Sequence, residues 1–298
     1  MPEHKYTILQ IGIICFLTAI IGVRLVSQYP GWFNGQSQNA LLHNRATQSA
    51  APFITLGSAT SAEDSGFLDH VLPIFERATG LYVHVEAIGT VQALARGARG
   101  NVDALLVHDR AEEENFVADG NGIDRRDVMY NDFVIVGPSF DPASIRGLRD
   151  VRKAFAQIAD KGVLFASRGD SGGTYRKELR LWKLAGVEPA GQAWYRKVDQ
   201  SVGATLNFAA ALNAYALTDR ATWANFKNRQ NLEVLTEGDP ALFNLYGSIL
   251  VNPAKWPEVK FSEAKMWEQW LTSRAGLDAI TSYRIAGEEL FFPPRPRL

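Results

Sequence analysis

The stretch FITLGSATSAEDSGFLDHVLPIFERATGLYVHVEA, residues 53–87, decides the fold class. It opens with a short strand-like run at 53–56, after which apolar residues recur at helical spacing until Thr79-Gly80 stops the helix. From Leu81 onward, apolar residues alternate with more polar neighbours, as they do in a strand. A strand, a helix and a second strand in this order are typical of a parallel or mixed sheet covered by helices.

The same alternation continues on both sides of a break at Gly137-Pro138. Before the break it predicts one lobe, and after the break it restarts and predicts a second lobe. The apolar run 246–251 is the expected return crossing to the first lobe. We therefore expect an α/β fold with two lobes, a cleft and two crossing segments. The further predicted elements are helices at 91–99, 112–118, 151–161, 175–185, 202–213, 264–271 and 275–282, and strands at 102–107, 133–136, 163–166 and 215–217.

The N-terminal end has a different character from the rest. Residues 6–23 are apolar almost without interruption and lie between Lys5 and Arg24. A secretory apolar region covers ~7–15 residues and a membrane-spanning helix ~20, so the segment predicts export, as a signal anchor or a signal peptide. A lipidated cysteine fits less well, because Cys15 lies in mid-span and Ile14 precedes it where a small residue is needed.

These observations predict four parts of the chain. Residues 1–28 form the signal anchor or signal peptide, and 29–51 form a polar linker. Residues 52–136 plus 252–298 form lobe 1, and residues 137–251 form lobe 2. The expected location is periplasmic or otherwise extracytoplasmic, with anchorage to the inner membrane through residues 6–23.

Composition excludes several classes of partner. The 298 residues are 46% hydrophobic and carry a formal charge of −1, without Lys/Arg runs, so nucleic acid is not an expected partner. Cys15 is the only cysteine, and the exported part therefore has no disulfide or zinc–thiolate site. The five histidines are scattered without metal-ligand spacing. We expect neither a metal cation nor a cofactor.

Two stretches place small hydroxyl and glycine residues directly before a helix. These are Ser58-Ala59-Thr60-Ser61 and the loop from Ser167 to Thr174, which also contains Arg168. Helix N-termini offer free N–H groups to anions, hydroxyls add neutral donors, and arginine supplies a fixed positive charge. A single such segment is more often just a helix cap. Two of them facing one cleft, one with arginine, favour an anion site.

The string Gly169-Asp170-Ser171-Gly172-Gly173 also occurs around the nucleophile of trypsin-like serine proteases. That chemistry needs a histidine base and an orienting carboxylate on a β-barrel. No histidine here sits in a matching motif, and the string leads into a helix. We therefore do not expect an enzyme.

From about Ile54 to Pro293 the chain resembles the tungstate-binding components of bacterial ABC transporters. Four stretches and two shorter ones carry the resemblance: DSGFLDHVLPIFERATG (64–80), DALLVHDRAEEENFVADGNGIDRRDVMYNDFVIVGP (103–138), SRGDSGGTYRKELRLWK (167–183), YALTDRATW (215–223), LYGSILVNPAKWP and GEELFFP. The resemblance implies a two-lobed periplasmic-binding fold of type II, which captures a tetrahedral oxyanion and presents it to a membrane permease.

The family's ligand loops can be carried over in part. The family's first loop is usually Thr-Thr-Thr-Ser, and this chain has Ala59 at one of those hydroxyl positions. The second loop usually has Asp-Ser at the place where this chain has Ser171-Gly172. The third loop usually reads Thr-Gly-Gln-Gly-Met, of which this chain retains only Gln200, between Asp199 and Ser201-Val202. An aspartate at 199 would repel a dianion if it faced the site. The candidate ligand-binding residues are Ser58, Thr60, Ser61, Ser167, Arg168, Ser171, Thr174, Gln200 and Ser201.

Three interpretations of function stay open at this point. The first is an extracytoplasmic solute-binding protein that captures tungstate or molybdate for an ABC transporter. The second is a divergent, membrane-tethered binding or sensor protein of the same fold that recognises another small ligand. A hydrolase is a distant third.

Overall fold

Strands and helices alternate along the part of the chain that the computed structural model describes, residues 51–294. The strands are β1 (Phe53–Ser58), β2 (Tyr82–Ala87), β3 (Ala104–Val107), β4 (Gly122–Pro138), β5 (Phe165–Ser167), β6 (Tyr195–Lys197), β7 (Tyr215–Asp219), β8 (Leu232–Thr236), β9 (Phe243–Val251), β10 (Arg284–Ile285) and β11 (Glu288–Glu289). The helices are α3 (Thr60–Asp64), α4 (Phe67–Thr79), α5 (Thr90–Gly97), α6 (Arg110–Ala118), α7 (Val151–Lys161), α8 (Gly173–Leu184), α9 (Val202–Leu212), α10 (Arg220–Asn225), the 3-10 helix η1 (Pro240–Leu242), α11 (Phe261–Leu271) and α12 (Arg274–Ser282).

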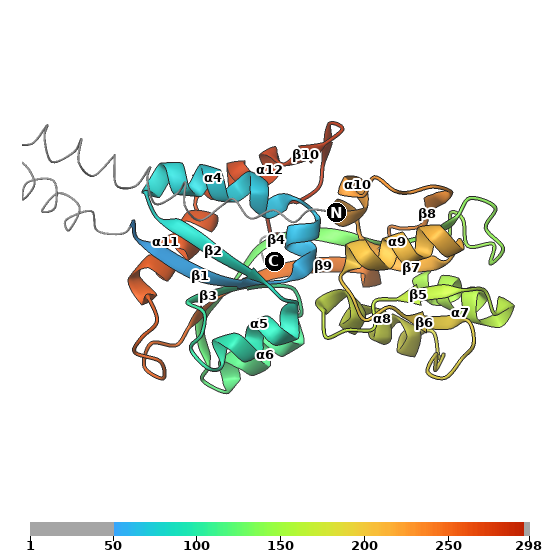
Figure 1. The fold of residues 1–298 in the computed structure, drawn as a ribbon, viewed down its shortest axis with the longest axis horizontal. Coiled ribbons are helices and arrows are strands. Elements are labelled where there is room, and N and C mark those ends of the chain that lie inside the picture. The colour runs from blue at the N-terminus through green and yellow to red at the C-terminus, as the bar shows by residue number, and fades with distance from the viewer. Residues whose placement is uncertain (1–50, 295–298) are drawn as a thin grey trace, which may run out of the picture. The chain divides into compact units, whose positions relative to one another are not determined.

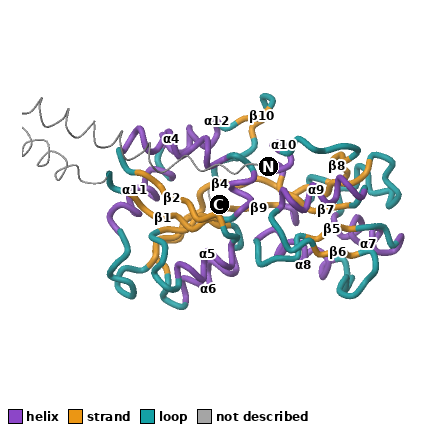
Figure 2. Tube along the Cα trace, in the orientation of Figure 1, coloured by secondary structure: helices purple, strands orange, loops and turns teal. Residues whose placement is uncertain are grey.

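A mixed sheet runs through both lobes. Its strand order is β2-β1-β3-β9-β4-β7-β5-β6, with β8 paired to β4. The pairs β1·β2, β1·β3, β5·β6 and β5·β7 are parallel, whereas β9 is antiparallel to both β3 and β4. Figures 1 and 2 show β4 and β9 running side by side between the two groups of helices. These two strands are the expected crossing segments.

The first lobe is covered by helices on both faces of its strands. Along β3, Ala104 and Leu106 pack in one apolar cluster with α4, α11 and α12, while Leu105 and Val107 pack in another with α5 and α6. Alternation of neighbouring side chains between two buried faces is the expected behaviour of a strand in a sheet that helices cover on both sides.

The second lobe repeats this arrangement on β4. Phe133 and Ile135 belong to a cluster with α7 and α8, and Val134 and Val136 belong to a cluster with α9. Each lobe therefore has its own core, and the expected α/β architecture of two lobes joined by two crossings is present. The lobe boundaries expected from sequence stay a prediction.

Most sequence-based elements are confirmed, and their ends follow local chemistry. Helix α4 stops at Gly80, whose φ of 70° lies in the left-handed region that glycine tolerates, and helix α7 has the predicted bounds. The sequence missed α3, β6, β8, α10, η1, β10 and β11, which are all short. It also placed the first crossing strand at 133–136, whereas β4 begins at Gly122. Charged residues in the first half of β4 concealed that strand.

Residues Pro52–Leu298 form one compact unit. Within residues 51–294, no helix combines the length and apolar character that crossing a membrane requires. The expected signal segment and linker lie outside the described residues.

Candidate functional site

Arg168 lies at the junction of the two lobes. It follows β5 directly, and its side chain is only 2% exposed. Its Nη2 donates to the Thr60 hydroxyl at 2.7 Å and to an Asp170 carboxylate oxygen at 2.7 Å. Thr60 is the first residue of α3, so the first contact joins lobe 2 to lobe 1. The predicted arginine is thus a buried cation positioned by both lobes.

Two glycines allow the guanidinium to lie there. A Cβ atom at Gly172 would stand 2.3 Å from the Cζ of Arg168, so the guanidinium packs directly against the backbone of residue 172. On the other lobe, a Cβ atom at Gly89 would stand 3.8 Å from the Nη2 of Arg168 and 3.5 Å from the Cα of Gly172. The loop before α5 and the loop before α8 therefore approach each other across Arg168.

Three buried donors in this region have no hydrogen-bond partner among the described residues. They are the Nε of Arg168 and the hydroxyls of Thr90 and Thr174. Thr90 opens α5 and Thr174 is the second residue of α8, so each lies in the first turn of a helix, where backbone N–H groups also lack intrahelical partners. An unsatisfied buried donor costs about 1–3 kcal/mol. Donors grouped around a cation at helix N-termini suit an anion that accepts from all of them.

The hydroxyl of Thr60 can join this set of donors. It accepts a hydrogen bond from Arg168, which leaves its own proton free to be donated. We call Thr60, Thr90, Arg168 and Thr174 the anion cradle. Three of its four members were predicted from sequence. Thr90 was missed, although the Gly89-Thr90 pair between a strand and a helix has the same composition as the two loops that were chosen.

Three of the predicted serines are buried in other contacts. Ser58 donates to the backbone oxygen of Leu106 at 3.2 Å, and Ser61 lies 2.8 Å from a ring nitrogen of His108. The hydroxyl of Ser167 accepts from Tyr195 at 2.8 Å. These side chains shape the loops beside the anion cradle.

The remaining predicted residues are not hydrogen-bonded to the cradle in the described part of the chain. Ser171 is half-buried and Gln200 is exposed. Ser201 caps its own helix α9 by accepting from Ala204. Another backbone N–H in the first turn of α9, that of Gly203, donates to the carboxylate of Asp64 in lobe 1 at 3.2 Å. The start of α9 is therefore already facing a carboxylate.

Gly172 and Asp199 differ from the residues that are usual at these positions in the tungstate-binding family, and the structure explains both differences. Asp199 is exposed and lies beside Gly169, where a Cβ atom would stand 2.7 Å from the Asp199 carboxylate. It is thus outside the group of buried donors. Glycine at 172 leaves room for the guanidinium, which a side chain there would displace.

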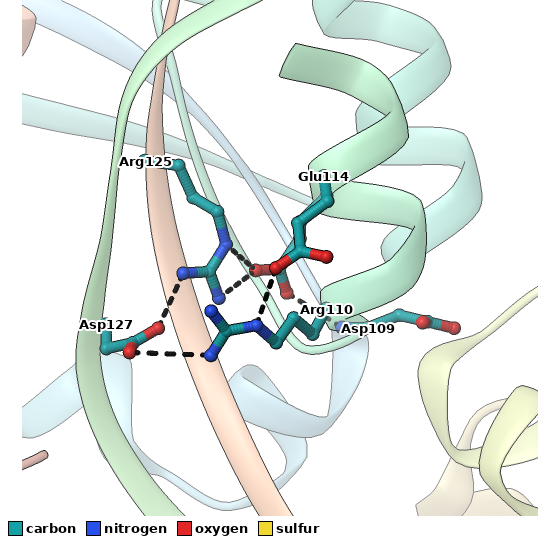
Figure 3. A network of polar contacts seen from close by, with 6 residues as sticks. Asp109, Arg110, Glu114, Arg125 and Asp127 are labelled. Atoms are coloured by element: carbon teal, nitrogen blue, oxygen red, sulfur yellow. Dashed lines mark hydrogen bonds and ion pairs between the residues drawn. The ribbon is translucent and has the colours of Figure 1, made fainter. Parts of the chain in front are cut away.

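A buried ion network supports the loop between β3 and α6 (Figure 3). Glu113 is fully buried, accepts from the backbone N–H of Asp109 at 2.8 Å, and pairs with Arg125 at 2.7 Å. Arg125 also pairs with Asp127 at 2.5 Å, and Arg110 contacts Glu114. Burial raises the pKa of the Glu113 carboxyl to about 7, and the charge of Arg125 opposes that shift. The network fixes the loop that carries His108 and Asp109.

Asp109 uses its own side chain to reach the other lobe. Both of its carboxylate oxygens accept from the Nη2 of Arg180 on α8, each at 2.7 Å. A cavity of about 310 Å³ lies between the lobes at this contact. Its lining includes Lys177, whose pKa burial lowers to about 8. The cavity is lined by His108, Asp109, Arg110, Phe133, Gly173, Lys177, Arg180, Phe243, Asn244 and Leu245.

Within residues 51–294, no group of three or more His, Cys, Asp or Glu side chains is arranged to hold a metal ion. The unpaired polar atoms of Thr90, Arg168 and Thr174 are all donors, and a set of donors suits an anion.

The chain matches a known superfamily of proteins. The model of the PBP superfamily domain matches residues 44–275. The chain belongs to the PBP superfamily. It is 41% identical over 243 residues to the tungstate-binding protein TupA of Peptoclostridium acidaminophilum, covering 81% of this chain and 84% of that protein. The expected periplasmic-binding-protein-like α/β fold is therefore confirmed.

Two solved structures are similar to this chain in both sequence and fold. A crystal structure described as the tungstate ABC transporter from Geobacter sulfurreducens has 46% identity and a TM-score of 0.72, covering 78% of this chain and 98% of that one. The tungstate-binding protein TupA from Desulfovibrio alaskensis G20 has 39% identity and a TM-score of 0.71, covering 83% and 100%. The chain is thus a PBP-superfamily member of the same family as these tungstate-binding proteins.

Proposed function

We propose that this protein captures a tetrahedral oxyanion, tungstate or molybdate, outside the cytoplasm and presents it to the permease of an ABC transporter. The observation that carries the proposal is a set of buried donors, on Thr90, Arg168 and Thr174, that have no hydrogen-bond partner within residues 51–294. The names of the relatives support the choice of anion.

The chemistry of the cradle agrees with an anion that carries no proton. Tungstate and molybdate have four oxygens that only accept hydrogen bonds, and the cradle offers hydroxyls, a guanidinium N–H and first-turn amides, which donate. The two anions have nearly the same size and charge, so the donors serve both. Binding needs no covalent step, and we propose a transport role without catalysis.

Delivery to a permease requires the protein to act at the outer face of the membrane. We propose that residues 6–23 direct export and anchor the chain to the inner membrane, with 29–51 as a tether. The apolar composition of 6–23 between Lys5 and Arg24 supports this assignment. Fractionation of the full chain tests it.

A thermal-shift panel on the fragment 52–298 tests the oxyanion proposal. Tungstate, molybdate, sulfate, phosphate and chromate are compared, and an anion at a hundred times its dissociation constant should add ~2.7 kcal/mol to the free energy of unfolding. We expect a shift with tungstate or molybdate that Arg168→Ala abolishes. No shift with any of the five anions, or one unchanged in Arg168→Ala, contradicts the proposal.

Threonine variants separate binding from folding. Thr90→Val and Thr174→Val each remove a buried hydroxyl that has no hydrogen-bond partner in the part of the chain that the structure describes. The unliganded fragment should therefore keep its stability while the anion-induced shift falls. Thr281→Val on α12, whose hydroxyl bonds its own helix, serves as the matched control and should leave the shift unchanged. A full shift in both cradle variants would show that the anion binds elsewhere.

A further inference from the structure

Five buried polar side chains form a continuous line of hydrogen bonds across the two crossing strands. They begin beside the anion cradle and end in lobe 2, and their exposed fractions range from 0% to 5%. The five are Ser61 on α3, His108 after β3, Asn244 on β9, Asn131 on β4 and Asp219 at the end of β7. We call them the hinge relay.

Each link of the hinge relay has hydrogen-bond geometry. The Ser61 hydroxyl lies 2.8 Å from Nε2 of His108, and Nδ1 of His108 lies 2.9 Å from Oδ1 of Asn244. Nδ2 of Asn244 donates to Oδ1 of Asn131 at 2.7 Å. Nδ2 of Asn131 then donates to Oδ1 of Asp219 at 3.2 Å. Asn131 and Asn244 are register partners on β4 and β9, so the relay crosses both strands at one level.

The carboxylate at one end sets the direction of every link. Burial raises the pKa of Asp219 to about 6, so at neutral pH the group is an ionised carboxylate, which only accepts. Asn131 must therefore turn its NH₂ group toward Asp219 and its oxygen toward Asn244. The same requirement then turns the NH₂ of Asn244 toward Asn131 and its oxygen toward His108. A backbone amide of α10, on Thr222, also donates to Oδ1 of Asp219 at 3.0 Å.

The direction of these hydrogen bonds determines which ring nitrogen of His108 carries the proton. Burial lowers the pKa of His108 to about 4, so the ring is neutral and carries one proton. Nδ1 of His108 faces the oxygen of Asn244, which only accepts, so the ring proton sits on Nδ1. Nε2 then has no proton and accepts a hydrogen bond from the Ser61 hydroxyl. The ring also stacks on Tyr246, with the ring centroids 4.8 Å apart, which fixes its plane.

We propose that the hinge relay positions the anion cradle, with Asn131 and His108 acting as positioning residues for anion binding. The relay holds Ser61, and Ser61 is the neighbour of Thr60, which touches Arg168 across the cleft. It also commits the proton of Ser61 to His108, so the anion receives its hydrogen bonds from the cradle alone. The predicted effect of the hinge relay on anion affinity rests on the proposed oxyanion function, whereas the predicted tautomer of His108 does not.

The tautomer is measured on the wild-type fragment 52–298, which is one compact unit. Long-range ¹⁵N–¹H correlation spectra of the His108 ring should show a protonated Nδ1 and an unprotonated Nε2, with or without tungstate. A ring protonated on Nε2, or on both nitrogens at neutral pH, overturns the relay. This measurement separates the inference from the proposed function, because it needs no bound anion.

The functional arm uses Asn131→Leu, which breaks the relay two links from Ser61 and alters no cradle residue. We expect His108 to lose its single tautomer and the tungstate dissociation constant to rise about tenfold, as the loss of a buried hydrogen-bond link implies. Asn228→Leu, which removes an exposed asparagine pair with Asn207, is the control and should change neither property. Asn131→Ala breaks the same link if the leucine variant does not fold. An unchanged dissociation constant in a folded variant with an altered tautomer overturns the positioning role.

Discussion

Thr60 and Ser61 are neighbours in the chain, yet their hydroxyls have opposite roles. Thr60 accepts from Arg168 and keeps its proton for a ligand, whereas Ser61 is held by His108. Both lie in the first turn of α3, in a segment whose composition favoured anion binding, and only the contacts of each side chain separate a ligand donor from a structural one. Hydroxyl residues in a ligand loop are thus not equivalent.

Gly172 provides a test at the same scale. Its φ of −74° and ψ of 158° are open to any residue, so the backbone of Gly172→Ala is unstrained, and any loss of stability in the unliganded fragment comes from moving the buried Arg168 side chain. The added Cβ atom would, however, stand 2.3 Å from Cζ of Arg168 and displace the guanidinium. We expect the tungstate dissociation constant to rise at least about tenfold, because a charge-assisted bond is worth ~1.5–3 kcal/mol. Titration calorimetry and urea unfolding measure the two effects, and unchanged affinity would show that Arg168 does not hold the anion.

Helix α11 carries a buried carboxylate that the anion cradle does not use. The Glu268 side chain is 0% exposed, and its nearest cation is Arg126, at 3.3 Å. Neither of its oxygens has a hydrogen-bond partner among the described residues. Burial raises the pKa of Glu268 to about 7. This carboxyl group therefore makes the fold sensitive to pH.

The sign of that dependence follows from the direction of the shift. The folded pKa lies above the unfolded value, so the folded state binds more protons in the window between about 4.5 and 7, and stability falls as pH rises through it. Glu268→Met should stabilise the protein at pH 8 by ~1–3 kcal/mol, and this advantage should shrink toward pH 5. Urea unfolding from pH 5 to pH 8 measures this, with Gln269→Met on the exposed side of the same helix as control. An advantage independent of pH would assign the gain to packing instead.

At the scale of the whole molecule, the two crossing strands determine what the lobes can do. Strand β9 pairs with β4 from Gly122 to Asp132, and contacts between the lobes flank the two strands, including Arg168 with Thr60 and Arg180 with Asp109. These contacts join the two lobes at the anion cradle, where both lobes supply donors to one site. An anion that bridges both lobes would stabilise that arrangement in preference to an open one.

The N-terminal segment gives a prediction at this scale. In a bacterial host, the full chain should sediment with inner membranes, resist alkaline extraction and keep residues 1–23 by mass spectrometry, whereas the fragment 52–298 should stay in the supernatant. Loss of the segment from a soluble periplasmic product would show a cleaved signal peptide. Recovery of the full chain in the cytosol would contradict export.

The sequence by itself determined the order of the longer elements and indicated an anion as the ligand. Periodicity and glycine stops are local properties, so they predicted α4 and α7 with correct ends, and hydroxyl and glycine residues before helices indicated an anion. The tertiary structure alone decided which hydroxyls are free. Thr90 joins Arg168 because two loops far apart in sequence meet there, Ser58 and Ser61 turn to internal partners, and Asp199 stays at the surface. A side chain's hydrogen-bond partner depends on packing between distant segments, which composition and spacing do not encode.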